Sequence, residues 1–272
     1  MRCTVLGSRG YVGSHLLRHL ESMHGIQTMT ESQLDSGPAR ASLGHVFYCI
    51  GVTTDFKSRL HDTMRAHVGK VVEILDSHKF DSFTYLSSTR VYENGRSGDE
   101  SSPLTADPSA IHDFYKISKI AGEAVCLANP SFNVRVVRLS NVLGMERPPL
   151  TFVPSIISDA LNSGSILMES SPDSAKDYIS MKDVVKMLPR IAIEGRHRIY
   201  NLASGRQHTH KEITDVICSV LGCSIQVKKD APRASFPEIS IARLVSDFDF
   251  QPQPVLKLVQ ELCLNYQAEG LR

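Results

Sequence analysis

Apolar segments of two kinds alternate along the first half of the chain. Short apolar runs, each of the length of a buried strand, occur at residues 3–7, 26–30, 45–51, 82–88 and 133–140. The longer segments between them repeat apolar residues at helical spacing, at residues 10–25, 58–77 and 109–128. Strands that alternate with helices predict βαβ units and a parallel sheet covered on both faces. The sequence therefore predicts an α/β fold with a doubly wound parallel sheet.

Several residues indicate where helices begin and end. Asp107 and Pro108 suit the cap and the first turn of the helix at residues 109–128. Thr209 and Glu212 have the spacing of a capping box, and Gly222 is the kind of residue on which such a helix commonly ends. A further helix is therefore predicted between Thr209 and Gly222.

The segment between the second and third strands is short. Only residues 31–44 separate the two apolar runs, and a crossover helix followed by another strand does not fit comfortably in that length. We therefore expect one edge strand of the sheet to be missing or vestigial.

The charged residues nearly balance. The chain has 30 Lys and Arg against 29 Asp and Glu, a formal net charge of +1. Such a chain has no broad basic field, so neither nucleic acid nor an anionic membrane is expected as a partner. No run of about 18 apolar residues occurs, so no membrane-spanning helix is predicted. We expect a soluble, cytoplasmic protein.

Cysteine and histidine do not form a recognisable metal pattern. The six cysteines contain no C-x-x-C pair, and several lie in apolar runs, which favours small buried core residues over a disulfide or metal framework. His208 and His210 are the closest histidine pair, and no third ligand has a suggestive spacing. We therefore predict no metal site, and we interpret the two histidines as polar loop residues.

Three glycines at a spacing of three residues follow the first strand. Gly7 permits a tight turn, Gly10 lets the backbone approach a pyrophosphate, and Gly13 lets the next helix pack against the sheet. The start of that helix presents free N–H groups and a positive dipole end to an anion. Glycines also mark ordinary turns, but at the first strand–helix junction of an α/β chain this spacing predicts dinucleotide binding.

The residues that would choose between NAD and NADP point in opposite directions. Glu31 ends the second strand, where an acidic side chain can hold the ribose 2′-hydroxyl and repel a 2′-phosphate. Arg9 within the glycine loop and Arg40 beyond the strand could instead neutralise that phosphate. Glu31 could also be an ordinary solvated carboxylate of a loop. The choice between NAD and NADP stays open.

A second group of residues could carry acid–base chemistry. Tyr115 and Lys119 are four residues apart on a predicted helix, so both project from one face. A nearby ammonium favours the phenolate and would bring the pKa of Tyr115 towards working pH. Tyr115 could then exchange a proton with a carbonyl or alcohol oxygen that Ser88 also contacts, while Lys119 bonds the nicotinamide ribose. The alternative for this spacing is an exposed amphipathic helix.

These motifs together resemble the extended short-chain dehydrogenases/reductases, the NAD-dependent epimerase/dehydratase family. The glycine loop matches, "LSSTRVYE" resembles the family's S-S-x-x-V-Y-G, and "YKISKIAGE" resembles Y-x-x-S-K-x-x-x-E. Three later segments, "VRLSNVLG", "KDYISMKDVV" and "IYNLASG", also resemble family motifs, so the resemblance covers nearly the whole chain.

The resemblance implies a Rossmann fold, an NAD or NADP cofactor and a nucleotide-diphosphate sugar as substrate. It implies the catalytic residues Ser88, Tyr115 and Lys119. The cofactor-binding residues would be Gly7, Arg9, Gly10, Tyr11, Val12, Gly13, Glu31, Tyr115 and Lys119. The substrate-binding residues would be Ser88, Thr89, Asn141, Lys176 and Arg233. Members often dimerise through two helices of the main domain, so a homodimer is a possible assembly.

The chain also departs from the family pattern. Glu93 replaces the glycine of V-Y-G, Lys116 replaces a frequent glycine, and the short 31–44 segment removes part of the usual adenine site. Thr89 and Arg90 stand where the dehydratases of the family carry an acid and a base, so 4,6-dehydration is not expected. Lys176 stands where many members have a diphosphate-binding arginine, and a lysine lacks the bidentate fork.

The chain is predicted to divide into two regions. Residues 1–145, together with about 176–204, form the dinucleotide-binding domain in this interpretation. Residues of about 146–175 and 205–272 form a small substrate-binding region, because the chain becomes proline-rich after residue 145 and its elements shorten.

Several functions fit these observations. The first is a nucleotide-sugar 4-ketoreductase or C4 epimerase that uses the Tyr/Lys/Ser chemistry with hydride transfer, with a slight preference for the reductase. Two alternatives are a non-catalytic NAD(P)-binding sensor or scaffold and a reductase of a carbonyl compound without a nucleotide.

Overall fold

The structure, a computed structural model, describes residues 1–34, 42–53 and 55–270. Six parallel strands form its central sheet in the order β2-β1-β3-β4-β5-β9. Their bounds are β1 Arg2–Leu6, β2 Gln27–Thr30, β3 His45–Tyr48, β4 Ser82–Ser88, β5 Val134–Leu139 and β9 Ile199–Leu202. The predicted doubly wound parallel sheet is confirmed.

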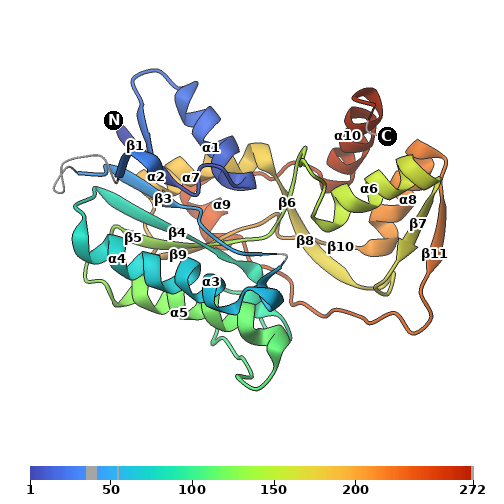
Figure 1. The fold of residues 1–272 in the computed structure, drawn as a ribbon, viewed down its shortest axis with the longest axis horizontal. Coiled ribbons are helices and arrows are strands. Elements are labelled where there is room, and N and C mark those ends of the chain that lie inside the picture. Colours follow the sequence, from blue (N-terminus) through green and yellow to red (C-terminus); the bar gives the residue numbers. More distant parts are fainter. Residues whose placement is uncertain (35–41, 54, 271–272) are drawn as a thin grey trace.

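Helices cover both faces of this sheet (Figure 1). One face carries α1 Tyr11–Glu21, α7 Met181–Glu194 and α9 Ala242–Phe248. The other carries α3 Leu60–Met64, a π-helical turn at Arg65–Gly69, α4 Lys70–Ser77 and α5 Phe114–Ala128. Helix α5 packs closely on this face, because a Cβ at Gly122 would lie 2.4 Å from both the His67 carbonyl oxygen and the Tyr85 hydroxyl.

Strand β2 lies at one edge of the central sheet. It is followed by the short helix α2, Glu31–Leu34, and the next described strand, β3, pairs on the far side of β1. Among the described residues no strand lies between β2 and β3, as the short segment predicted; residues 35–41 lie outside this description.

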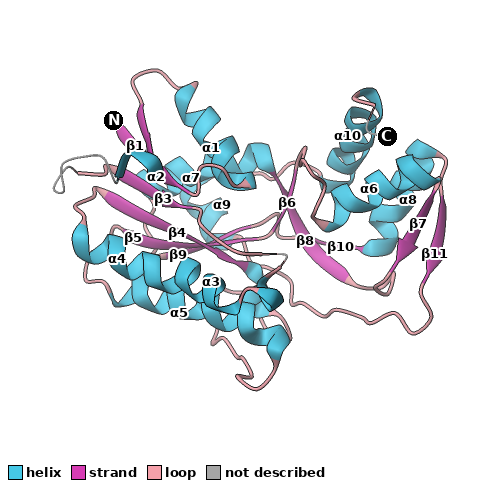
Figure 2. Ribbon diagram, in the orientation of Figure 1, coloured by secondary structure: helices cyan, strands magenta, loops and turns pink. Residues whose placement is uncertain are grey.

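A second group of elements lies beside the carboxyl edge of the central sheet (Figure 2). Its three-stranded sheet has the order β10-β8-β6, and a separate pair joins β11 to β7. The strands are β6 Asn141–Leu143, β7 Ser165–Met168, β8 Ala175–Ser180, β10 Gln207–Thr209 and β11 Ser224–Val227. The helices are α6 Phe152–Ser163, α8 His210–Leu221 and α10 Val255–Ala268. They share a core that includes Ile157, Ile213 and Val259.

The predicted division into two regions stays a prediction, and two elements bear on its boundaries. Helix α7 and strand β9 return to the central sheet, whereas β8 pairs with β6 and β10 instead. Helix α9 buries Leu244 and Phe248 in the same core as Val137 of β5. An amphipathic segment shows which of its faces is buried but not the element against which that face packs, so the sequence did not indicate this placement.

The helix-end predictions have mixed outcomes. The capping box is confirmed: the Thr209 hydroxyl accepts a hydrogen bond from the Glu212 N–H, and the Glu212 carboxylate accepts one from the Thr209 N–H. The predicted end is also confirmed, since α8 ends at Gly222, which has φ +69°. The predicted start of α5 is wrong. Residues Ile111–Asp113 form a 3-10 turn and Asp113 is the N-cap, while Asp107 accepts from the Ser109 N–H.

The histidine prediction is wrong, and the cysteine prediction holds in part. His208 lies in β10 and His210 begins α8, and both are buried rather than in loops. Of the cysteines, Cys3, Cys126 and Cys263 are fully buried. The described residues contain no group of three or more potential ligands placed to hold a metal ion, and none of their helices is long and apolar enough to cross a membrane.

A buried ion pair joins helix α5 to the central sheet. Arg138 of β5 lies 2.7 Å from the Glu123 carboxylate of α5, and each side chain is at most 4% exposed. The Ser87 hydroxyl of β4 also donates to Glu123, and Arg138 donates to the Tyr92 hydroxyl. This network holds α5 in register with the end of β4, where Ser88 follows.

Arg138→Met should destabilise the protein strongly, because it leaves the Glu123 carboxylate buried without its cation. A loss of about 3–5 kcal/mol is typical of breaking such a pair. Urea unfolding measures the loss. The matched control is Arg59→Met, which removes solvent-exposed contacts to Asp55 and Asp62 and should leave stability nearly unchanged. An equal loss of stability in the two variants would contradict the role given to the buried pair.

Candidate active site

The glycine loop packs tightly against its surroundings. Gly7 has φ +84°, and a Cβ there would lie 2.7 Å from the Ile50 backbone nitrogen beyond β3. A Cβ at Gly13 would lie 2.1 Å from the Gly7 carbonyl oxygen. Only glycine fits at either position without a backbone shift. Gly10, by contrast, is exposed, so its bare backbone faces outward.

The start of α1 is open to an anion. Gly10 is its N-cap and provides no side-chain hydrogen bond, and no acidic residue lies in the first turn. The free N–H groups and the positive end of the helix dipole therefore favour a negatively charged group. Arg9 is exposed next to this end, and Tyr11 and Val12 begin the helix. This arrangement fits the pyrophosphate of a dinucleotide.

Glu31 is bound to the glycine loop. Its Oε2 accepts from the backbone N–H groups of Gly7, at 3.2 Å, and Ser8, at 3.3 Å. The interpretation of Glu31 as an ordinary solvated carboxylate is therefore wrong. Arg40, the other residue weighed for cofactor choice beyond β2, lies outside the described residues.

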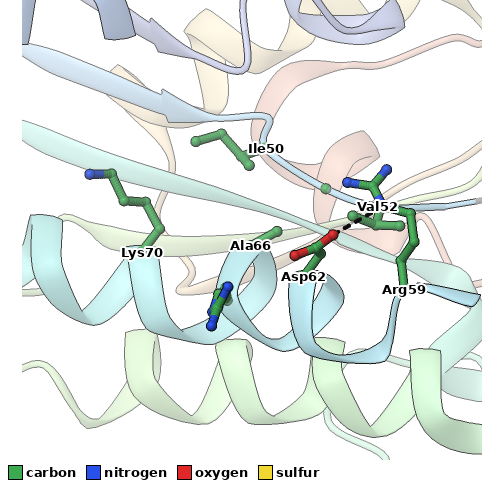
Figure 3. A pocket seen from close by; sticks show the side chains of 8 residues that line it. Ile50, Val52, Arg59, Asp62, Ala66 and Lys70 are labelled. Carbon is green, nitrogen blue, oxygen red and sulfur yellow. Dashed lines mark hydrogen bonds and ion pairs between the residues drawn. The ribbon is translucent and has the colours of Figure 1, made fainter.

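A pocket of about 480 Å³ lies beside the segment that follows β3 (Figure 3). It is lined by Ile50, Gly51, Val52, Arg59, Asp62, Arg65, Ala66 and Lys70. Ile50 meets Gly7 on one side, and Val52 packs against Tyr115 on the other. Two residues of the pocket wall, Ile50 and Val52, therefore neighbour the glycine loop and Tyr115.

Tyr115 lies in the first turn of α5 and is only 5% exposed. Its side chain packs with Val52 and Phe56 and hydrogen-bonds to the Ser88 side chain at the carboxyl end of β4. Burial raises the pKa of Tyr115, while the Arg90 cation and the hydrogen bond to Ser88 lower it. The guanidinium of Arg90 lies 5.0 Å from the centre of the Tyr115 ring.

Lys119 lies one helical turn further along α5. Its Nζ donates to the Leu86 carbonyl oxygen at 2.9 Å and lies 5.1 Å from the centre of the Tyr85 ring. Burial lowers the pKa of Lys119 to about 8, against the opposing effect of the Glu123 carboxylate. Arg90 is a second cation that lowers the pKa of Tyr115, and the sequence analysis did not consider it for this role; the role of Lys119 stays a prediction.

His67 is a site residue that the sequence analysis missed. It lies on the π-helical turn, is fully buried, and contacts the Tyr115 ring edge-on at 5.4 Å. Its Nε2 accepts from the Val52 N–H at 3.2 Å, and Nδ1 lies 2.8 Å from the Ser118 hydroxyl. Burial lowers the pKa of His67 to about 2, so the ring is neutral and Nδ1 carries the proton. His67 therefore joins the pocket wall to α5. No sequence motif marked it.

Two of the predicted substrate residues, Asn141 and Lys176, lie on the neighbouring strands β6 and β8. Asn141 donates to the Asp177 carbonyl oxygen at 2.8 Å, next to Lys176. Lys176 is half-buried, and burial together with the nearby Arg90 cation lowers its pKa. Residues 232–234, which include the exposed Arg233, are hydrogen-bonded to the loop before β8. Thr89 is buried behind Ser88.

The fold and these residues define a nicotinamide-dependent enzyme of the short-chain dehydrogenase/reductase type. A model of the NAD dependent epimerase/dehydratase family matches residues 3–203, so the chain belongs to that family. The resemblance inferred from the motifs is confirmed.

Individual relatives are distant in sequence but similar over their whole length. A dTDP-4-dehydro-6-deoxy-D-allose reductase of Streptomyces is 22% identical over 97% of this chain and 95% of that protein. The NAD-dependent NDP-hexosamine 5,6-dehydratase TunA superposes with a TM-score of 0.80 at 17% identity, over 100% of this chain and 99% of TunA. The UDP-glucuronic acid 4-epimerase of Bacillus cereus, solved with UDP-glucuronic acid and NAD, gives 0.78 at 16% identity over 99% of each chain.

The effect of Arg90 on Tyr115 can be tested by ultraviolet titration of phenolate, because the chain has eight tyrosines and no tryptophan. Burial raises the pKa of all eight tyrosines. A nearby cation opposes this rise at Tyr115, as it does at Tyr92 and Tyr266, so Tyr115 should ionise among the earliest steps, and Tyr115→Phe should remove one phenolate from them. In Arg90→Gln the Tyr115 step should move to higher pH, because the phenolate loses its stabilising charge. Tyr178→Phe is the control. Unchanged early steps in both Tyr115→Phe and Arg90→Gln would contradict this assignment.

Proposed function

We propose that this protein is an NAD(P)-dependent oxidoreductase that transfers hydride at C4 of a nucleotide-diphosphate sugar, with reduction of a 4-keto group as the preferred direction. The observation that carries the proposal is the junction between glycine loop, pocket and Tyr115. Ile50 contacts the loop, Val52 contacts the phenol ring, and Ser88 bonds the phenol. A dinucleotide with its pyrophosphate on the loop would extend along this pocket towards Tyr115.

The side chains would divide the acid–base work. A bound nicotinamide dinucleotide supplies the hydride that adds to the substrate carbon. Tyr115 gives its proton to the substrate oxygen, and the Ser88 hydroxyl holds that oxygen in place. Arg90 stabilises the phenolate that remains, because its charge lies over the ring. Lys119, anchored on the Leu86 carbonyl, is within reach of a ribose beside Gly51, since a Cβ at Gly51 would lie 3.6 Å from its Nζ.

The choice between NAD and NADP rests on opposing charges. Glu31 places a carboxylate against the loop, which favours a free ribose hydroxyl over a 2′-phosphate. Arg9 is exposed next to the loop, and Arg59, Arg65 and Lys70 line the pocket. Of these cations, Arg59 is paired with Asp55 and Asp62, and Lys70 with Glu73. Both coenzymes therefore stay in the proposal.

The substrate diphosphate would bind between the two groups of elements. Burial lowers the pKa of Lys176 and the Arg90 cation lowers it further, so two positive charges lie close enough to repel each other. An anion between them would relieve that repulsion. Asn141 lies on β6, the neighbour of β8, and Arg233 lies in a segment that is hydrogen-bonded to the loop before β8. The similarity to enzymes of dTDP- and UDP-sugars supports a nucleotide-linked substrate.

Epimerisation at C4 is the second candidate, favoured by the likeness to the Bacillus cereus 4-epimerase. The two reactions differ in their use of coenzyme. A reductase consumes reduced coenzyme in every turnover, whereas an epimerase returns the hydride to the other face of the sugar and consumes none. Coenzyme absorbance recorded during turnover separates them.

Tyr115→Phe should abolish turnover while leaving dinucleotide binding intact. The substitution keeps the ring that packs with Val52 and Phe56 and removes only the proton donor. We expect a loss of about 10²–10⁴-fold in kcat, the usual contribution of general acid–base catalysis. Tyr178→Phe is the control, since its buried hydroxyl has no hydrogen-bond partner among the described residues. Full activity of Tyr115→Phe would contradict the role given to Tyr115, whereas a wild type that binds coenzyme without any turnover would favour the non-catalytic sensor.

Nucleoside diphosphates should protect the protein against thermal unfolding. In the presence of coenzyme we expect one of UDP, dTDP, GDP or CDP, at about 100 times its Kd, to add about 2.7 kcal/mol of stability. Lys176→Met should reduce this protection, because the diphosphate loses one of its cations. Lys211→Met, a change at an exposed pair with Asp215, should not reduce it. Protection by none of the four would favour a substrate without a nucleotide.

A further inference from the structure

Two cysteines outside the candidate active site lie in direct contact. The Sγ atoms of Cys218 and Cys223 are 3.0 Å apart, against about 2.05 Å in a disulfide bond. Both are free thiols. Closing the remaining gap requires a movement of roughly 1 Å, the difference between those two lengths.

The backbone brings these sulfur atoms together. Helix α8 ends on Gly222 in the left-handed conformation, with the Gly222 N–H donating to the Cys218 carbonyl oxygen at 2.9 Å. In this kind of helix end, the residue after the glycine packs back on a residue of the last helical turn. Cys223 is that residue, and it leads into β11, whose first N–H donates to the Gly164 carbonyl oxygen. The contact therefore follows from two anchored elements.

The pair also differs from the other cysteines in its access to solvent. Cys218 and Cys223 are both partly exposed, whereas Cys3, Cys126 and Cys263 are fully buried. Cys49 is partly exposed, but no other sulfur atom is recorded in contact with it among the described residues. A small oxidant can therefore reach this pair while the fold stays intact.

We propose that Cys218 and Cys223 form a redox-active dithiol that a hydroperoxide converts into an intramolecular disulfide. One thiolate attacks the peroxide oxygen, which breaks the O–O bond and gives a sulfenic acid and, after protonation, one molecule of water. The second thiol attacks the sulfenic sulfur, forms the S–S bond and releases a second water. Two thiols together lose two electrons and two protons, and hydrogen peroxide is reduced to two waters. A dithiol reductant reverses the bond.

The surroundings of the two cysteines indicate which sulfur reacts first with the oxidant. Burial and the contact with Cys223 raise the pKa of Cys218 to about 12. A thiol that stays protonated is a poor nucleophile, so Cys218 is the less reactive sulfur of the pair. Cys223 is the sulfur that reacts first with the oxidant, and Cys218 is the sulfur that resolves it.

The test uses the full chain and hydrogen peroxide. After brief oxidation, the protein is alkylated under denaturing conditions and analysed by intact and peptide mass spectrometry. We expect the wild type to lose two alkylatable thiols and two hydrogen atoms, with the disulfide joining Cys218 and Cys223 inside the single tryptic peptide 212–228. Dithiothreitol should restore both thiols. This result does not depend on the proposed enzymatic activity.

Three serine variants test which cysteines form the disulfide. Cys263→Ser should still form the disulfide, because Cys263 is buried and not part of the contact. Cys218→Ser should leave Cys223 oxidised to a sulfenic acid that dimedone traps, whereas Cys223→Ser should leave Cys218 largely unreacted. A wild type whose two thiols persist, or whose first disulfide includes Cys263 or a second chain, would overturn the proposal. That result on the wild type stands even if a variant fails to fold.

Discussion

The contact between the glycine loop and the segment after β3 determines the geometry of the site. Gly7 lies so close to the Ile50 nitrogen that any side chain there would displace β3 from β1. The two segments leave neighbouring strands of a parallel sheet at the same edge, where such folds bind their ligands. From Ile50 the chain continues directly to Val52, which packs on Tyr115. One backbone contact therefore relates the anion-binding loop to the phenol.

The second constraint is the burial of charge around helix α5. Glu123 and Arg138 neutralise each other in the core, His67 is neutral, and Lys119 is held by a carbonyl group. Arg90 is the cation that lowers the pKa of Tyr115, and its side chain is partly exposed. In the proposed mechanism, Arg90 would therefore act both on the acid–base step and on substrate binding.

Much of the fold could be predicted because its signals are local. Strand β4 spans residues 82–88 as its apolar run indicated, and the capping box of α8 depends on residues three apart. The start of α5 was missed, since the 3-10 turn before it is held by the contact between Asp113 and the Asp107 N–H. The partners of β8 and α9 were also missed, because their apolar faces fit more than one core.

In the candidate site too, residues in local motifs could be predicted, whereas residues placed by distant contacts could not. Gly7, Gly13, Ser88 and Tyr115 lie in motifs with fixed spacing, and the sequence could place them at one sheet edge. His67 contacts residues that are 15 and 51 positions away in the sequence, so no local sequence motif could indicate its role. The sequence predicted that α8 ends at Gly222. It did not predict that this helix end brings the sulfur atoms of Cys218 and Cys223 into contact.

The central claim is that the glycine loop is the cradle of a dinucleotide. The most direct measurement is a fluorescence titration of NADH and of NADPH into the wild type and into Gly10→Val. Gly10 is exposed and has φ −75°, which valine can adopt; its Cβ would lie 3.3 Å from the Gly7 carbonyl oxygen, so the valine fills the space over the loop with only a small local shift. The account predicts saturable binding of at least one coenzyme to the wild type and its loss in the variant. A wild type that binds neither, or a variant that binds as tightly, would contradict it.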